Sequence, residues 1–209
     1  MRVIAGSAKG HTLTAPRGLA IRPTTDKVKG AIFSMLDSLR WAELGEEAPY
    51  FPRVLDLYAG TGALGIEALS RGSAHCDFVE NNARARAAIT ENLRRTRLAE
   101  LASLHALRAE AALSTFPGPY DLILADPPYA DPGLLDLLDK LSASGIIYAQ
   151  TLLVIEHARS VELPTNPGHL HQARTRYHGT SAITLYTAEA SDVEQLSEGP
   201  ERPPRPVSR

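Results

Sequence analysis

The side chains best suited to chemistry stand in the string Asp126-Pro127-Pro128-Tyr129, which follows an apolar run. The carboxylate of Asp126 and the carbonyl of Pro127 can each accept a hydrogen bond from an exocyclic amine of a nucleic-acid base. These acceptors return electron density to a nitrogen whose lone pair is delocalised into the ring. Two consecutive prolines make the turn rigid, because proline fixes φ and lacks a backbone N–H. Tyr129 can stack on a base that has left its helix. Taken singly, Asp126 could cap a turn and Tyr129 could belong to the core.

A second stretch, from Val54 to Gly65, predicts a ligand site built from backbone. An apolar strand pattern runs into Gly60 and Gly62, and a helical pattern follows at once. Such a turn brings bare backbone and a helix N-terminus close to a ligand. The G-x-G-x-x-G spacing alone also fits NAD. Asp56 favours S-adenosylmethionine (SAM), because a carboxylate suits its ammonium and sulfonium better than a pyrophosphate.

Further positions complete the predicted SAM site. Glu80 ends the second expected strand, where a carboxylate can accept both ribose hydroxyls, although it could also belong to an ordinary helix start. The predicted SAM-binding residues are Asp56, Ala59, Gly60, Thr61, Gly62, Glu80, Asn81 and Glu110.

Charge is distributed unevenly along the chain. The net charge is −2, yet residues 1–30 alone carry a net +5. A basic arm on an acidic domain is typical of an enzyme that grips nucleic-acid phosphates on one side, although a solubilising terminus would look similar. The predicted nucleic-acid-binding residues are Arg2, Lys9, Arg22 and Lys27.

The apolar patterns predict an α/β protein of three parts. Residues 1–50 should form a basic β-hairpin and a helix, residues 51–190 the SAM domain, and residues 191–209 a proline-rich disordered tail. The expected strands of the SAM domain are 54–57, 74–79, 102–107, 120–125, 151–156, 170–177 and 182–186, and its expected helices include 63–71, 83–98 and 134–141.

Composition indicates a cytoplasmic protein. Cys76 is the one cysteine, so no internal disulfide can form, and we expect it to be a small buried residue. No apolar run approaches the ~18 residues of a membrane span, and the N-terminus lacks the apolar core of a signal peptide. We expect no metal site, because the histidines lack ligand spacing.

These motifs together resemble the RsmD type of bacterial 16S rRNA guanine-N2 methyltransferase. The resemblance covers roughly residues 1–188 and rests on M-R-V-I-A-G, R-P-T-T-D-K-V-K, D-L-Y-A-G-T-G-A-L-G-I-E-A-L-S-R-G and L-A-D-P-P-Y. The first two strings make it specific, since many base methyltransferases share the others. Gly30 departs from the family, which usually has Glu there.

The resemblance implies a Rossmann-like methyltransferase fold with a seven-stranded, mostly parallel sheet whose last strand is antiparallel. It implies transfer of a methyl group from SAM, without a metal, to N2 of one guanine in 16S rRNA. The rRNA would be part of an assembling small subunit, and the enzyme would be a monomer. The catalytic residues would be Asp126, Pro127 and Tyr129. Glu110 would contact the adenine of SAM, unless it only stabilises a helix start. The alternatives are an adenine-N6 methyltransferase on DNA or RNA and a nicotinamide-dependent oxidoreductase.

Overall fold

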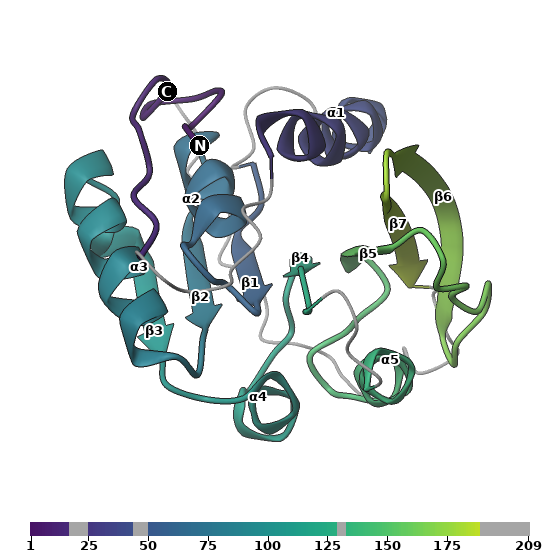
Figure 1. Ribbon diagram of the computed structural model, residues 1–209. Helices are drawn as coiled ribbons and strands as arrows, with labels where there is room; N and C mark the ends of the chain where they lie inside the picture. The colour runs from purple at the N-terminus through teal and green to yellow at the C-terminus, as the bar shows by residue number, and fades with distance from the viewer. Residues whose placement is uncertain (17–24, 44–49, 129–132, 189–209) are drawn as a thin grey trace, which may run out of the picture.

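A single twisted sheet of seven strands organises the protein (Figure 1). The computed structural model describes residues 1–16, 25–43, 50–128 and 133–188. The strand order is β3-β2-β1-β4-β5-β7-β6, with β1 to β5 parallel and β7 antiparallel to both of its neighbours. The strands are β1 Arg53–Leu57, β2 His75–Val79, β3 Ala102–His105, β4 Leu122–Ala125, β5 Leu152–Ala158, β6 Leu170–His178 and β7 Ser181–Ala188. The predicted sheet is therefore confirmed.

Helices cover both faces of the sheet, as the Rossmann-like prediction requires (Figure 1). Residues of α1, α2 and α3 share one core cluster, and residues of α4 and α5 share the other. The helices are α1 Asp26–Glu43, α2 Ala63–Ser70, α3 Ala83–Thr96, α4 Ala109–Thr115 and α5 Leu134–Ser142, with a 3₁₀ turn η1 at Ala99–Leu101. None of the helices in the described ranges is long and apolar enough to cross a membrane.

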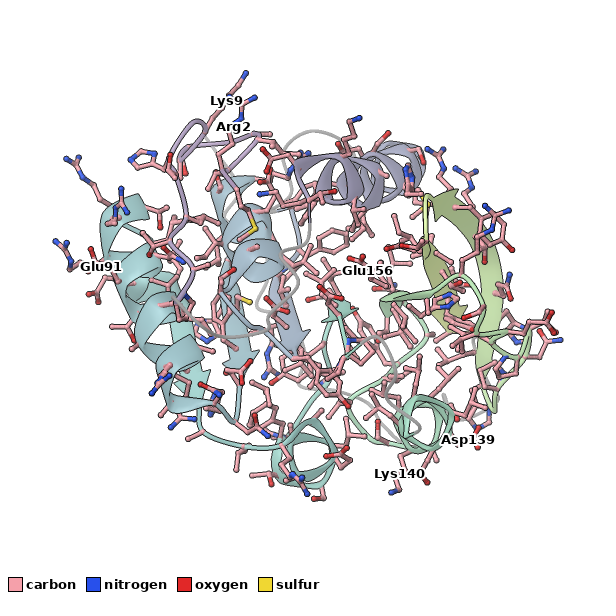
Figure 2. The ribbon with its side chains drawn as sticks, viewed as in Figure 1. Arg2, Lys9, Glu91, Asp139, Lys140 and Glu156 are labelled. Atoms are coloured by element: carbon pink, nitrogen blue, oxygen red, sulfur yellow. The ribbon has the colours of Figure 1, made fainter. Side chains whose placement is uncertain are left out.

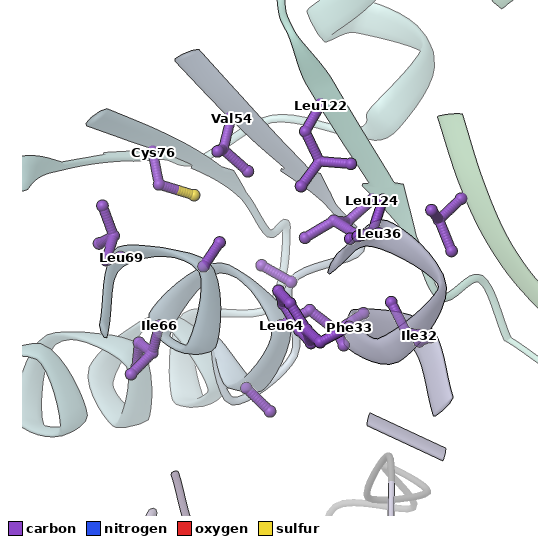
Figure 3. Packing of buried hydrophobic residues seen from close by; sticks show 14 of the residues in the cluster. Ile32, Phe33, Leu36, Val54, Leu64, Ile66, Leu69, Cys76, Leu122 and Leu124 are labelled. Atoms are coloured by element: carbon purple, nitrogen blue, oxygen red, sulfur yellow. The ribbon is translucent and has the colours of Figure 1, made fainter. Parts of the chain in front are cut away.

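The core explains why the central strands are apolar on both sides. Val54 belongs to the cluster beneath α1 and α2, whereas Leu55 belongs to the cluster on the opposite face. Parallel strands buried on both faces need such continuous apolar runs. Cys76 is fully buried among these residues, as predicted (Figure 3).

The glycine turn depends on a close approach of α2 to β2. A Cβ atom at Gly65 would lie 2.3 Å from Cε1 of Phe78 and 2.8 Å from Sγ of Cys76. Only glycine lets the helix lie this close to the strand. The last glycine of G-x-G-x-x-G thus sets where the helix start sits relative to the sheet.

The N-terminal segment turns back on itself, but it forms less β-structure than the predicted hairpin. Val3 donates a backbone hydrogen bond to His11 at 3.0 Å, and a single bridge joins Arg2 to Thr12. Pairing stops there because the next amides, of Ile4 and Ala5, donate to the carboxylate of Glu67 in α2. The segment shares the core of α1 and α2. The boundary at residue 50 stays a prediction, and residues 191–209 lie outside the described ranges.

Candidate active site

Three acidic side chains meet at the carboxyl edge of the sheet. Asp56 lies in β1, Glu80 follows β2, and Asp126 follows β4. Because these strands are parallel neighbours, their carboxyl ends converge at one edge, where open α/β sheets bind ligands. Asp126 and Glu80 both act electrostatically on Asp56. The structure therefore brings together residues from the two predicted motifs.

Asp56 is the most perturbed group at this edge. The side chain is buried, and its Oδ2 accepts a hydrogen bond from the backbone N–H of Gly65 at 2.8 Å. Its Oδ1 is buried without a hydrogen-bond partner among the described residues. Burial raises the pKa of Asp56 to about 8, and the charges of Asp126 and Glu80 add to the rise although the Gly65 N–H opposes it. An unsatisfied buried acceptor costs ~1–3 kcal/mol, which a cationic donor would offset.

The backbone between β1 and α2 takes left-handed conformations. Gly60 has φ 55° and Gly62 has φ 77°, both disfavoured for side-chain-bearing residues. Tyr58 has φ 58° although it is not glycine, a conformation that costs energy and often marks a ligand site. Gly62 caps α2 without a side-chain hydrogen bond. The turn leaves bare backbone at this edge, as its glycines predicted.

Glu80 links the glycine turn to the start of α3. Its Oε2 accepts from the N–H of Gly60 at 2.9 Å, and its Oε1 accepts from the N–H of Asn82 at 2.7 Å. The helix cap itself is Asn82, whose Oδ1 accepts from Arg84 at 2.9 Å. Each oxygen of Glu80 keeps a further lone pair that could accept a hydrogen bond from a ribose hydroxyl. The ribose role of Glu80 stays a prediction. Asn81 is exposed, and its role also stays a prediction.

Asn92 supports the glycine turn from α3, and sequence reasoning missed it. Its side-chain amide is buried and donates to the carbonyl of Thr61 at 2.9 Å, while its Oδ1 accepts from the N–H of Thr14 at 2.8 Å. Thr61 itself is buried, as is Ala59, whose N–H donates to the carbonyl of Val79 at 3.0 Å. One side chain thus joins the N-terminal segment to the predicted SAM site. An asparagine at an apolar helical position was the available signal.

Glu110 lies apart from this cluster, in the first turn of α4. It is exposed and lines a shallow groove between α4 and α5 with Leu113, Ser114 and Lys140. The position follows β3, as predicted, and both of its proposed roles stay predictions.

Asp126 and Pro127 leave the end of β4 with different exposure. Asp126 is partly exposed, whereas Pro127 is buried. Tyr129 lies outside the described residues. Ala125 pairs with Ile155 of β5, so the next residues, Asp126 and Glu156, follow side by side on neighbouring strands.

Glu156 is a second residue that sequence reasoning missed. It is buried in β5, and its Oε1 accepts from the hydroxyl of Ser181 at 3.0 Å. Figure 2 places it well inside the outline of the molecule, whereas Asp139 and Lys140 lie on the outer side of α5. Because a buried carboxylate needs polar partners, a glutamate that ends an apolar strand pattern was the available signal for such a contact.

The predicted phosphate-binding residues are exposed where the structure describes them. Arg2 and Lys9 point outward on the same side of the molecule (Figure 2), and Lys27 is exposed on α1. Nε of Arg2 lies 3.6 Å from Oδ2 of Asp26, which partly offsets its charge. Arg22 lies outside the described residues.

Lys29 corrects the charge argument for the N-terminal arm. Its ammonium lies 3.1 Å from Oε2 of Glu67, and both side chains are fully buried. The net +5 of residues 1–30 includes Lys29. Counting it toward a basic surface was therefore wrong, since a buried and neutralised charge is not available to phosphate.

Comparison with known proteins decides the family. Residues 1–187 match the model of a family described as Conserved hypothetical protein 95. The chain belongs to this family, the RsmD family. YlbH of Bacillus subtilis, provisionally named an rRNA methyltransferase, is 40% identical over 195 residues, which cover 89% of this chain and 98% of the relative. Ribosomal RNA small subunit methyltransferase D of Escherichia coli is 29% identical over 91% of each chain.

A solved structure shares the fold. This structure, from Escherichia coli and provisionally described as the methyltransferase yhhF, is 30% identical and superposes with a TM-score of 0.77 over 91% of this chain and 99% of that one. This RsmD-family chain is a methyltransferase with a Rossmann-like fold. Family membership argues against the nicotinamide-dependent oxidoreductase that the glycine spacing alone allowed.

Proposed function

We propose that this RsmD-family methyltransferase transfers a methyl group from SAM to the N2 amine of one guanine in 16S rRNA. The observation that carries the proposal is the placement of Asp56 and Asp126 at the ends of the neighbouring strands β1 and β4. One carboxylate suits a cationic co-substrate and the other suits a base amine. The name of the Escherichia coli relative supports small-subunit rRNA as the substrate.

The residues around Asp56 fit SAM. The unpartnered Oδ1 of Asp56 is suited to the ammonium of the amino-acid end, and Glu80 to the ribose. The bare backbone at Gly60 and Gly62 leaves room for a ligand to approach closely. When bound, SAM supplies an electrophilic methyl group on its sulfonium, and no metal is needed for that chemistry.

Asp126 and Pro127 would act on the base. The carboxylate of Asp126 and the carbonyl of Pro127 would accept the two protons of the amine and turn its lone pair outward for in-line attack. Asp126 is partly exposed and can take up the proton that the methylated amine releases. Tyr129 would stack on the flipped base, a contact worth ~1–3 kcal/mol. Held between these groups, the amine would lose its water shell and be oriented toward the methyl group of SAM.

Methyl transfer from labelled SAM tests the proposal. The substrates are small subunits from cells lacking this protein, naked 16S rRNA and duplex DNA, and mass spectrometry identifies the modified nucleoside. N2-methylguanine in the rRNA is the expected product, and comparing naked RNA with subunits reports whether assembly is required. N6-methyladenine in any substrate would contradict the guanine assignment.

A further inference from the structure

The C-terminal hairpin of β6 and β7 has an unusual charge pattern. Residues 163–188 contain Arg174, Arg176 and three histidines but no Asp or Glu, in a chain whose net charge is −2. Both arginines are exposed on β6 and form no ion pair with any residue in the described ranges. The hairpin is therefore a basic element on an acidic protein.

The sheet register places this element on the substrate side of the active site. Apart from Glu110, the predicted SAM residues lie in β1 or just after β1 and β2. From β1 the sheet continues through β4, β5 and β7 to β6. Arg176 pairs with Ile183, which in turn pairs with Glu156, the strand neighbour of Asp126. At ~4.8 Å per strand, the backbone of β6 lies about 14 Å from that of β4. Nucleotides that flank a base held at Asp126 can span this distance.

Arg174 and Arg176 also lie on the same face of the sheet as Asp56. Residues paired directly across a sheet point to the same side, so Arg174 and Arg176 share the face of Leu185 and Ile183. That face carries α1 and the side chain of Asp56. Arg176 thus stands in one row with Glu156, at the edge where the proposed chemistry occurs.

An exposed aromatic ring lies on the other face of the same strand, because Tyr177 follows Arg176 directly and pairs with Ala182. Tyr177 has a relative exposure of 59%, and the guanidinium carbon of Arg159 lies 4.9 Å from its ring centroid. A tyrosine held by an arginine in this way offers a surface on which a base can stack beside a phosphate-binding cation.

We propose that the edge strand β6 binds the rRNA strand next to the target guanine, through Arg174 and Arg176 on one face and through Tyr177 with Arg159 on the other. These four residues are here called the β6 edge surface. The arginines contact phosphates, and Tyr177 stacks on an unpaired base. This inference rests on the proposed function, since it takes RNA as the substrate. A competing explanation is that the charges only keep an exposed edge strand from pairing with other chains.

Salt-dependent binding to small subunits from cells lacking this protein separates these explanations. The double variant Arg174→Gln and Arg176→Gln should bind about tenfold more weakly, and the slope of log K against log salt should fall by about 1.4–1.8, because two phosphate contacts are lost. Tyr177→Ala should weaken binding without changing the slope. SAM affinity and melting temperature should match the wild type for both variants.

The matched control is Arg94→Gln with Arg95→Gln on α3, which covers the opposite end of the sheet (Figure 1) and removes the same charge. An unchanged slope in the β6 variant, or an equal loss in the control, would overturn the inference. If the wild type methylates rRNA and the β6 variant binds equally well, only this inference fails. If the wild type methylates no RNA, the proposed function itself fails.

Discussion

Lys29 and Glu67 form a fully buried ion pair with 3.1 Å between Nζ and Oε2. Glu67 also accepts hydrogen bonds from the N–H groups of Ile4 and Ala5, and its Oε1 lies 3.0 Å from Nε of Arg71. One carboxylate therefore ties the N-terminal segment, α1 and α2 together. The two sequence motifs R-P-T-T-D-K-V-K and D-L-Y-A-G-T-G-A-L-G-I-E meet physically at this pair.

Replacing Lys29 with methionine should destabilise the protein by about 3–5 kcal/mol, because breaking a buried pair leaves Glu67 short of a partner. Urea unfolding measures the change. The control is Lys27→Met, an exposed lysine two positions earlier on the same helix, which should change stability by no more than about 0.5 kcal/mol. Equal effects of the two substitutions would mean that the buried pair contributes nothing.

Gly65→Ala should destabilise the fold by about 1–3 kcal/mol or more, because its Cβ would overlap the buried ring of Phe78. Gly30→Ala is the matched control in α1, where a Cβ would make only an ordinary contact of 3.7 Å with Ile4. That control should stabilise the protein by about 0.5–1 kcal/mol, since alanine favours the helix interior. Thermal melting should show a lower melting temperature for Gly65→Ala and a higher one for Gly30→Ala. A shift in the same direction for both variants would refute the packing argument.

The buried carboxyl of Asp56 should make the stability of the ligand-free protein depend on pH. Its pKa is about 8 in the fold, against an ordinary value of 3.8. Between these values the folded protein holds a proton that the unfolded chain has released, so the free energy of unfolding falls as pH rises. The loss from about pH 5 to about pH 8 is at most about 4 kcal/mol, at 1.36 kcal/mol per unit.

Asp56→Asn should flatten this dependence, and urea unfolding at both pH values tests it. In the wild type, SAM should reverse the trend, because its ammonium favours the ionised carboxylate and binding then releases a proton. Calorimetry in buffers of different ionisation enthalpy measures that proton. An equally steep pH dependence in the asparagine variant would assign the effect to another group.

Asp126→Ala should reduce methyl transfer by at least about 10²-fold, because the amine loses an acceptor for its proton. SAM affinity should remain, since Asp126 lies on the base side of the edge. Asp139→Ala on the outer side of α5 is the control and should leave turnover unchanged. Retained turnover in the Asp126 variant would remove this carboxylate from the mechanism.

By itself the sequence determined the seven strands, their order along the chain and the two motifs that carry the chemistry, but neither the helix α4 nor the loose pairing of the N-terminal segment. The spacing of apolar residues in runs such as 54–57 predicts a strand, and glycines such as Gly62 predict a turn. Both signals depend only on residues that are close in the chain, so the sequence alone is enough to detect them. The position of Asp56 four residues before Gly60 already indicated a cation-binding carboxylate.

Only the tertiary structure decided which distant residues share an environment. Lys29 counts as a surface charge in the sequence, yet folding buries it against Glu67, 38 positions away. Glu156 becomes a neighbour of Asp126 through strand register, and Arg176 joins their row through two further pairings. Burial and long-range pairing depend on how the strands assemble, and no local pattern encodes that. The same physics raises the pKa of Asp56, because its environment consists of residues brought in from other strands and helices.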